Sequence, residues 1–147
     1  MRSVGQNQGM SSLGETYERW EPAPDLPEQM LATVNVQSNG RNLTAIVHFD
    51  DTAPQPALRL QFGLVEAFKV YEEFSDCWRG QAQPMMPNPL LKQVAWPFQE
   101  VRNSEWINRV LTRNGVLEGR VWRHFVIVTV DVTLHVMTDG DVKNTRA

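Results

Sequence analysis

The chain has 147 residues, of which 41% are hydrophobic and 21% are charged, and its net charge is −3 at pH 7. These values are typical of one globular domain, and they disfavour binding to nucleic acid or to an anionic membrane, because both need a concentrated basic surface. The single cysteine, Cys77, excludes an intrachain disulfide and a cysteine metal cluster.

The sequence offers no targeting or membrane segment. Its first ten residues lack the apolar run of a secretory signal, and the most apolar segment, 125–137, is interrupted by polar residues. We therefore expect a cytoplasmic protein, and a lone cysteine fits that reducing compartment.

The first 29 residues are rich in glycine, serine, glutamine, glutamate and proline and offer no periodic apolar face. This composition predicts a flexible N-terminal arm. Leu13, Tyr17 and Trp20 are spaced as on one face of a helix, so a short helix that docks on the body or on a partner is the alternative.

Two strands are predicted next, over 31–36 and 43–49, on either side of Ser38-Asn39-Gly40-Arg41. Asn-Gly is a favoured hairpin pair because both residues tolerate positive φ angles. The second strand alternates, with Leu43, Ala45, Val47 and Phe49 on one face. We therefore expect a β-hairpin.

A further strand begins at Leu58, because every second residue from there to Leu64 is apolar. Over 64–74 a continuing strand competes with a helix that would align Phe68, Tyr71 and Phe74. We favour a strand that bends near Gly63, because aromatic and β-branched residues are frequent and no N-cap residue precedes Leu64.

Residues 75–97 contain four prolines and predict a long loop. A helix follows it, since Asn103 and Ser104 are good N-cap residues, Glu105 suits the first turn and Asn114-Gly115 provides a stop. The apolar stripe of this helix consists of Trp106, Ile107, Val110 and Leu111.

The last apolar segment is too long for one strand of a small domain, so we expect a second hairpin, 125–129 and 132–137, that turns near Asp131. The order of elements predicts an α+β fold: a mainly antiparallel β-sheet of about five strands with one principal α-helix packed on it. The domain would span 30–140, between the N-terminal arm 1–29 and a C-terminal tail 141–147.

The sequence contains no recognised catalytic motif. His48, His124 and His135 match no short metal-ligand spacing, although a turn at Asp131 would make His124 and His135 close neighbours. No motif surrounds Cys77, which we interpret as a loop thiol without a role. We therefore expect no metal, no cofactor and no catalytic residue.

Glu66 and Glu72 conflict with the predicted strand, because the alternation would place both carboxylates on its apolar face. Buried paired carboxylates are suited to acid–base chemistry or to ligand binding. The alternative is a helix or a bulge that turns both to solvent. Possible ion-pair partners are Arg59, Arg79 and Arg123.

Tryptophan beside arginine or proline recurs in the predicted loops. Both Trp and Arg are enriched among the residues that dominate protein interfaces. We therefore expect Trp78, Arg79 and Trp96 of the long loop to contact a partner protein. The alternative is that the tryptophans are satellite core beneath the loop.

Three segments carry a resemblance: Phe62-x-x-Val65-Glu66-Ala67-Phe68-Lys69-Val70, Asn103-Ser104-Glu105-Trp106 and the strand pair that starts at His124 and ends at Val136. Over about residues 30–140 the chain resembles a group of small bacterial α+β proteins, some of which are similar to immunity proteins encoded beside secreted toxins. The resemblance implies protein binding and transfers no site residue.

We therefore expect a small cytoplasmic, non-enzymatic domain that binds another protein, in its sharper form an immunity-type inhibitor of a toxin. One alternative is a small-molecule-binding or hydrolytic domain that uses Glu66 and Glu72 in a cleft between sheet and helix. Another is a structural subunit of an assembly, with the N-terminal arm reaching to a neighbour.

Overall fold

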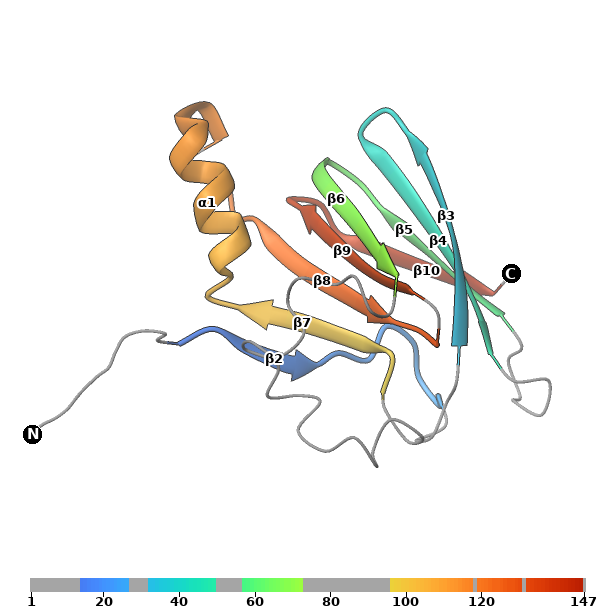
Figure 1. The fold of residues 1–147 in the computed structure, drawn as a ribbon. Coiled ribbons are helices and arrows are strands. Elements are labelled where there is room, and N and C mark those ends of the chain that lie inside the picture. The colour runs from blue at the N-terminus through green and yellow to red at the C-terminus, as the bar shows by residue number, and fades with distance from the viewer. Residues whose placement is uncertain are drawn as a thin grey trace, which may run out of the picture.

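Two antiparallel sheets and one helix make up the part of the chain that the computed structural model describes, residues 14–26, 32–49, 57–72, 96–117, 119–130 and 132–146 (Figure 1). Nine strands lie in this part, four in one sheet and five in the other. The expected α+β fold with one five-stranded sheet is thus corrected to a sheet-dominated fold. The mainly antiparallel pairing and the principal helix are confirmed.

The four-stranded sheet has the order β10-β5-β4-β3. Its members are β3 (Ala32–Asn39), β4 (Asn42–Phe49), β5 (Ala57–Phe62) and β10 (Val142–Arg146). The predicted hairpin is confirmed in β3 and β4. Its two-residue loop is Gly40-Arg41, because Asn39 pairs with Asn42, and Gly40 has the positive φ of 64° that such a loop needs.

The five-stranded sheet has the order β2-β7-β8-β9-β6. Its members are β2 (Thr16–Arg19), β6 (Val65–Glu72), β7 (Phe98–Arg102), β8 (Arg123–Val128) and β9 (Val132–Thr138). The predicted second hairpin is confirmed, since β8 pairs with β9 and Thr129 and Val132 hydrogen-bond across the turn. A short 3-10 helix, η2 (Gly115–Leu117), follows the α-helix, α1 (Glu105–Arg113).

The two sheets are joined at a corner where a pair of strands bends together. β5 continues into β6 through Gly63 and Leu64, while β9, the neighbour of β6, continues into β10, the neighbour of β5, around Gly140. A Cβ atom on Gly140 would lie 2.8 Å from the Gly63 carbonyl oxygen, so only glycine allows this approach. The predicted bend at Gly63 is confirmed, and the strand continues to Glu72 in place of the alternative helix.

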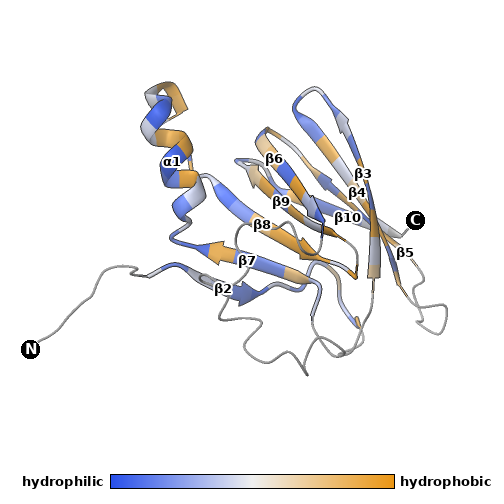
Figure 2. Cartoon of the chain, viewed as in Figure 1, coloured by the Kyte–Doolittle hydropathy of each residue, from blue (hydrophilic) through white to orange (hydrophobic). Residues whose placement is uncertain are grey.

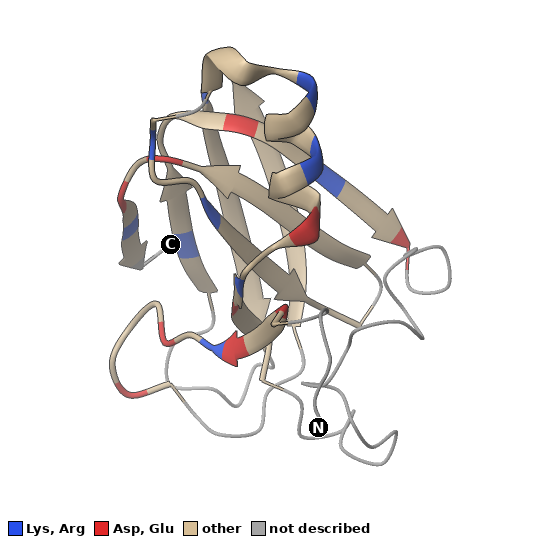
Figure 3. Cartoon of the chain, turned by 90° about the vertical axis from the view of Figure 1, so that its left-hand side faces the viewer, with Lys and Arg blue, Asp and Glu red and all other residues tan. Residues whose placement is uncertain are grey.

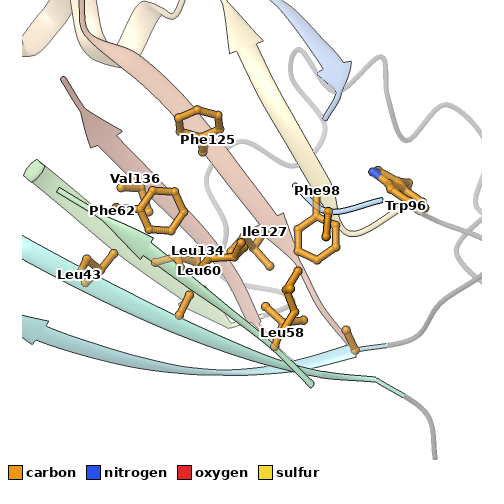
Figure 4. Close-up of a cluster of buried hydrophobic side chains, with 14 of the residues drawn as sticks. Leu43, Leu58, Leu60, Phe62, Trp96, Phe98, Phe125, Ile127, Leu134 and Val136 are labelled. Carbon is orange, nitrogen blue, oxygen red and sulfur yellow. The ribbon is translucent and has the colours of Figure 1, made fainter. Parts of the chain in front are cut away.

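The hydrophobic core lies between the facing sides of the two sheets. Leu58, Leu60 and Phe62 of β5 meet Phe125 and Ile127 of β8 there (Figure 4). β3 and β5 alternate between hydrophobic and hydrophilic residues along their length (Figure 2), as expected of a sheet with one face in the core. In β8 the apolar run from Phe125 to Val128 is continuous, because both faces of this strand are covered. We call this side of the five-stranded sheet its core face, and the opposite side its helix face.

Two segments that the sequence placed outside the domain contribute strands. Within the predicted arm, β2 pairs with β7, and Trp20 packs its ring against Phe62, Phe98 and Phe125. Within the predicted tail, β10 pairs with β5. For 14–26 and 142–146 the expectation of an arm and a tail is therefore corrected. The reason is long-range pairing, which local composition does not reveal.

Trp96 is a core residue in this fold. Its side chain is 9% exposed, its ring packs edge-on against Phe98, and its Nε1–H donates to the Trp20 carbonyl oxygen over 2.7 Å. The Arg19 guanidinium lies 3.8 Å from the ring centroid on its remaining side. This geometry corresponds to the satellite-core alternative.

We predict that Trp96→Ala lowers the free energy of unfolding by about 3–5 kcal/mol, because a large buried ring is removed. Trp96→Phe should lower the free energy of unfolding by less, since it keeps an aromatic ring and loses only part of the ring and the hydrogen bond to the Trp20 carbonyl oxygen. Chemical denaturation of both variants, with exposed Val121→Ala as the control, measures the effect. An unchanged free energy of unfolding for Trp96→Ala would contradict a core role and would favour Trp96 as a partner contact.

Candidate functional site: a helix held by a buried histidine pair and its exposed tip

The start of α1 is fixed by contacts from two directions. The Ser104 hydroxyl accepts the N–H of Ile107 over 3.1 Å, and a carboxylate oxygen of Glu15 accepts the N–H of Glu105 over 2.8 Å. Both bonds satisfy N–H groups that a helix leaves unpaired at its first turn, and the carboxylate suits the helix dipole. The predicted helix start at Ser104 is therefore confirmed.

Beneath this helix start, two buried histidines share the helix face of the five-stranded sheet. His124 of β8 and His135 of β9 are each 1% exposed. His124 Nε2 lies 2.9 Å from His135 Nδ1, and His124 Nδ1 lies 2.8 Å from the Ser104 hydroxyl. The hydroxyl that caps α1 thus also contacts the sheet. The sequence-based expectation that the two histidines are neighbours is confirmed.

This line of three side chains can be fully hydrogen-bonded with both rings neutral. The Ser104 hydroxyl donates to His124 Nδ1 and His124 Nε2–H donates to His135 Nδ1, or both bonds run in reverse. A second proton on His124 would turn both of its nitrogens into donors. Burial lowers the pKa of His124 well below the usual 6.5, and the nearby His135 and the charge of Lys69 lower it further.

Trp106 covers the pair from the helix. Its ring centroid lies 4.9 Å from that of His124 and 6.2 Å from that of His135, in edge-on arrangements. The Lys69 ammonium of β6 lies 4.5 Å from the Trp106 ring centroid, and Tyr71 of β6 packs edge-on against His135. Aromatic and cation–π contacts therefore join the helix to β6, β8 and β9.

Serine beside histidine is also the pairing of many nucleophilic catalysts, and the geometry here excludes that role. Ser104 is buried, and its hydroxyl is engaged by both the Ile107 N–H and His124. A catalytic serine must instead present its oxygen to a substrate. The arrangement therefore anchors α1 to the sheet.

The other end of α1 leads to a protruding segment, 114–117 and 119–122, that we call the tip (Figure 1). Val116 and Val121 lie in the tip and are 89% and 77% exposed. Trp122 Nε1–H donates to the Leu117 carbonyl oxygen over 2.8 Å, and Arg120 forms a 2.9 Å ion pair with Asp139. The tip is thus tied back to the protein while its valines face solvent.

Charges near the tip are mixed. Figure 3 views the molecule from the side on which α1 lies, and basic and acidic positions are interspersed there. Arg113, in the last turn of α1, is exposed, whereas Arg120 is paired with Asp139. This side therefore offers apolar contact and individual arginines rather than a surface of one sign.

The structure does not bring Glu66 and Glu72 together. Glu66 forms a 2.8 Å ion pair with Arg41 of the β3–β4 loop, and Glu72 is exposed at the far end of β6. A bulge between Val65 and Ala67 breaks the alternation on which the prediction rested. For Glu66 the geometry thus follows the alternative of a bulge, whereas Glu72 shares the face of Phe68 and Val70 and is exposed there with them.

Among the residues that the structure describes, the buried carboxylate is Glu100, which was not expected from the sequence. Arg123, one of the arginines considered as a partner for a buried carboxylate, donates to both Glu100 oxygens, over 2.8 and 3.0 Å. The Arg123 guanidinium also lies 4.7 Å from the Phe125 ring centroid. A paired charge at the margin of the core is a structural feature, and the bond to Glu100 raises the pKa of Arg123.

Of the expected partner contacts, Trp96 lies in the core, while Trp78 and Arg79 fall outside the described residues, as does Cys77. His48 lies on the four-stranded sheet, far along the chain from the buried pair. Within the described ranges, no group of three or more histidine, cysteine, aspartate or glutamate residues could hold a metal ion. The exposed tip was not anticipated, although two valines among glycines and charged residues were its available signal.

Comparison with known proteins adds no relative. No family model matches the chain, and no match was found among curated proteins or solved structures. In the part of the chain that the structure describes, no helix is long and apolar enough to cross a membrane.

We predict that the free energy of unfolding decreases as the pH falls below about 6.5, because the unfolded chain takes up a proton on His124 that the folded protein excludes. Denaturation at a series of pH values measures this slope. His124→Gln should flatten it, whatever its effect on absolute stability. The control Val121→Ala, at an exposed position, should leave the slope as it is, and equal slopes in the wild type and His124→Gln would contradict the prediction.

Proposed function

We propose that this protein is a non-enzymatic domain that binds another protein through the tip after α1. The observation that carries the proposal is the exposure of Val116 and Val121, at 89% and 77%. Apolar side chains this exposed gain most from burial against a partner. Trp122 and Arg113 flank them and belong to the residue types that are enriched at interfaces.

The support beneath the tip favours binding without prior reorganisation. Ser104, Trp106 and the two histidines fix the start of α1, and the Trp122–Leu117 bond closes the tip itself. A surface that is already ordered loses less conformational entropy on association. The partner that fits has an apolar depression with carboxylate or carbonyl acceptors at its rim, which Arg113 can meet.

The sharper form of the proposal follows the resemblance to immunity-type proteins. In that form the protein acts in the cytoplasm of a bacterium, and its partner is a toxin that the neighbouring gene encodes. The domain would inhibit the toxin by covering a functional surface with the tip, so no catalytic residue is required of the inhibitor.

We predict that Val116→Asp/Val121→Asp weakens binding to the product of the neighbouring gene by at least about tenfold, since hot-spot truncations cost about 2 kcal/mol or more. Both side chains are exposed, so the unfolding free energy should change little. Titration calorimetry measures the affinity, and a growth assay measures protection from the toxin.

Val130→Asp is the matched control, because this partly exposed valine lies in the β8–β9 turn, away from the tip. It should bind as the wild type does. Equal affinity of the wild type and the double variant would refute the tip as the binding surface. Absence of binding by the wild type would instead count against the neighbouring gene product as the partner.

A further inference from the structure

Among the strands of the described ranges, β3 lies at a sheet edge and differs from the other three edge strands. The edges formed by β2, β6 and β10 contain charged residues such as Glu18, Lys69 and Lys143, whereas the eight residues of β3 contain none. β3 also pairs with β4 along its whole length without a bulge. Charges, bulges and shortness are the usual protection against pairing of a free edge, and β3 has none of them.

The backbone groups that β3 directs outward follow from its register. Asn39 and Asn42 close the two-residue loop, so their pair is hydrogen-bonded and every second pair along β3 is too. The N–H and C=O groups of Val34, Val36 and Ser38 therefore point away from β4. Ala32 belongs to the same set, and its carbonyl oxygen accepts the N–H of Val130 outside the sheet, over 3.0 Å.

The neighbours of β3 determine which side chains a strand added at this edge must carry. The hairpin loop and β6 meet where the Val65 N–H donates to the Arg41 carbonyl oxygen. On β6, Phe68 and Val70 lie opposite Val136 and Leu134, on the core face, yet are 41% and 45% exposed. A strand added here thus needs apolar side chains toward the core and polar ones outside.

We propose that a second copy of this chain occupies the edge, with β3 pairing antiparallel to β3 of that copy about a two-fold axis at Val36. β3 itself has the side-chain pattern that an added strand needs. Val34 and Val36 are half-buried toward the core, while Thr33, Asn35 and Gln37 are exposed outside. The absence of charge removes repulsion between identical strands. The dimer contains one continuous sheet built from both four-stranded sheets.

The outward backbone groups select the register. Val36 pairs with Val36 of the copy, and Val34 pairs with Ser38 of the copy, which gives about six backbone hydrogen bonds between the strands. The exposed face then sets Asn35 opposite Gln37 of the copy. Side-chain amides facing each other in this way hydrogen-bond across strands. This inference is independent of the tip, which lies beyond the other sheet.

Charge substitutions on the exposed face test both the dimer and its register. Asn35→Lys/Gln37→Lys sets like charges opposite each other twice and should raise the dimer dissociation constant at least about tenfold. Asn35→Lys/Gln37→Glu places opposite charges at the same two positions and should remain a dimer. Sedimentation velocity over a range of concentrations, with the full chain, measures the constant.

The control Asn108→Lys/Thr112→Lys adds the same two charges on exposed positions of α1 and should leave the dimer unchanged. Hydrogen exchange should show the amides of Val34, Val36 and Ser38 slowing as the protein concentration rises. Circular dichroism confirms that each variant is folded. A wild type that stays monomeric at all concentrations, or a dimer that both charge variants leave intact, would overturn the proposal.

Discussion

The contact on which the rest of this structure depends is the close passage of Gly140 over Gly63. The two strand pairs β5–β10 and β6–β9 are halves of one ribbon that bends at these glycines. Because both strands turn together, the paired backbone groups on either side of the corner remain satisfied, and the hydroxyl of Thr138 bonds to the Gly63 carbonyl oxygen between them. The bend brings the apolar faces of the two sheets opposite each other.

A second set of stabilising contacts lies on the helix face of the five-stranded sheet. With one face of that sheet in the core, the other is left for α1, and the contact there is partly polar: a hydroxyl, two imidazoles and an indole. Hydrogen bonds are directional, so this row of polar side chains fixes where the helix starts. Contact through an apolar stripe alone would allow the helix to slide along the sheet. Of the expected stripe, Trp106 takes part in this contact, and Ile107 is buried.

Features that depend on neighbouring residues were predictable from the sequence. Asn39-Gly40 located the first hairpin, Ser104 located the start of α1, and the polar break at Asp131 located the second hairpin. Features that depend on distant residues were not. Trp96 belongs to the core because of Trp20, and Glu66 leaves the alternation because a bulge meets the turn of another hairpin. The exposed tip could not be located without knowing how far α1 projects from the sheets.

The strand order has a consequence for how the chain reaches this state. β2 pairs with β7, as Thr16 with Arg102, and β5 pairs with β10, as Leu58 with Arg146, so both pairings join residues more than half the chain apart. Folding rates fall as the mean sequence separation of native contacts rises, because loop closure precedes the gain from pairing. The local hairpins β3–β4 and β8–β9 can form early, while the sheet that contains β10 is complete only when residue 146 has been synthesised. The long-range pairings make folding slow. During that time the hairpin of the uncharged strand β3 is formed while its sheet is still incomplete, so the protein concentration affects the outcome of folding.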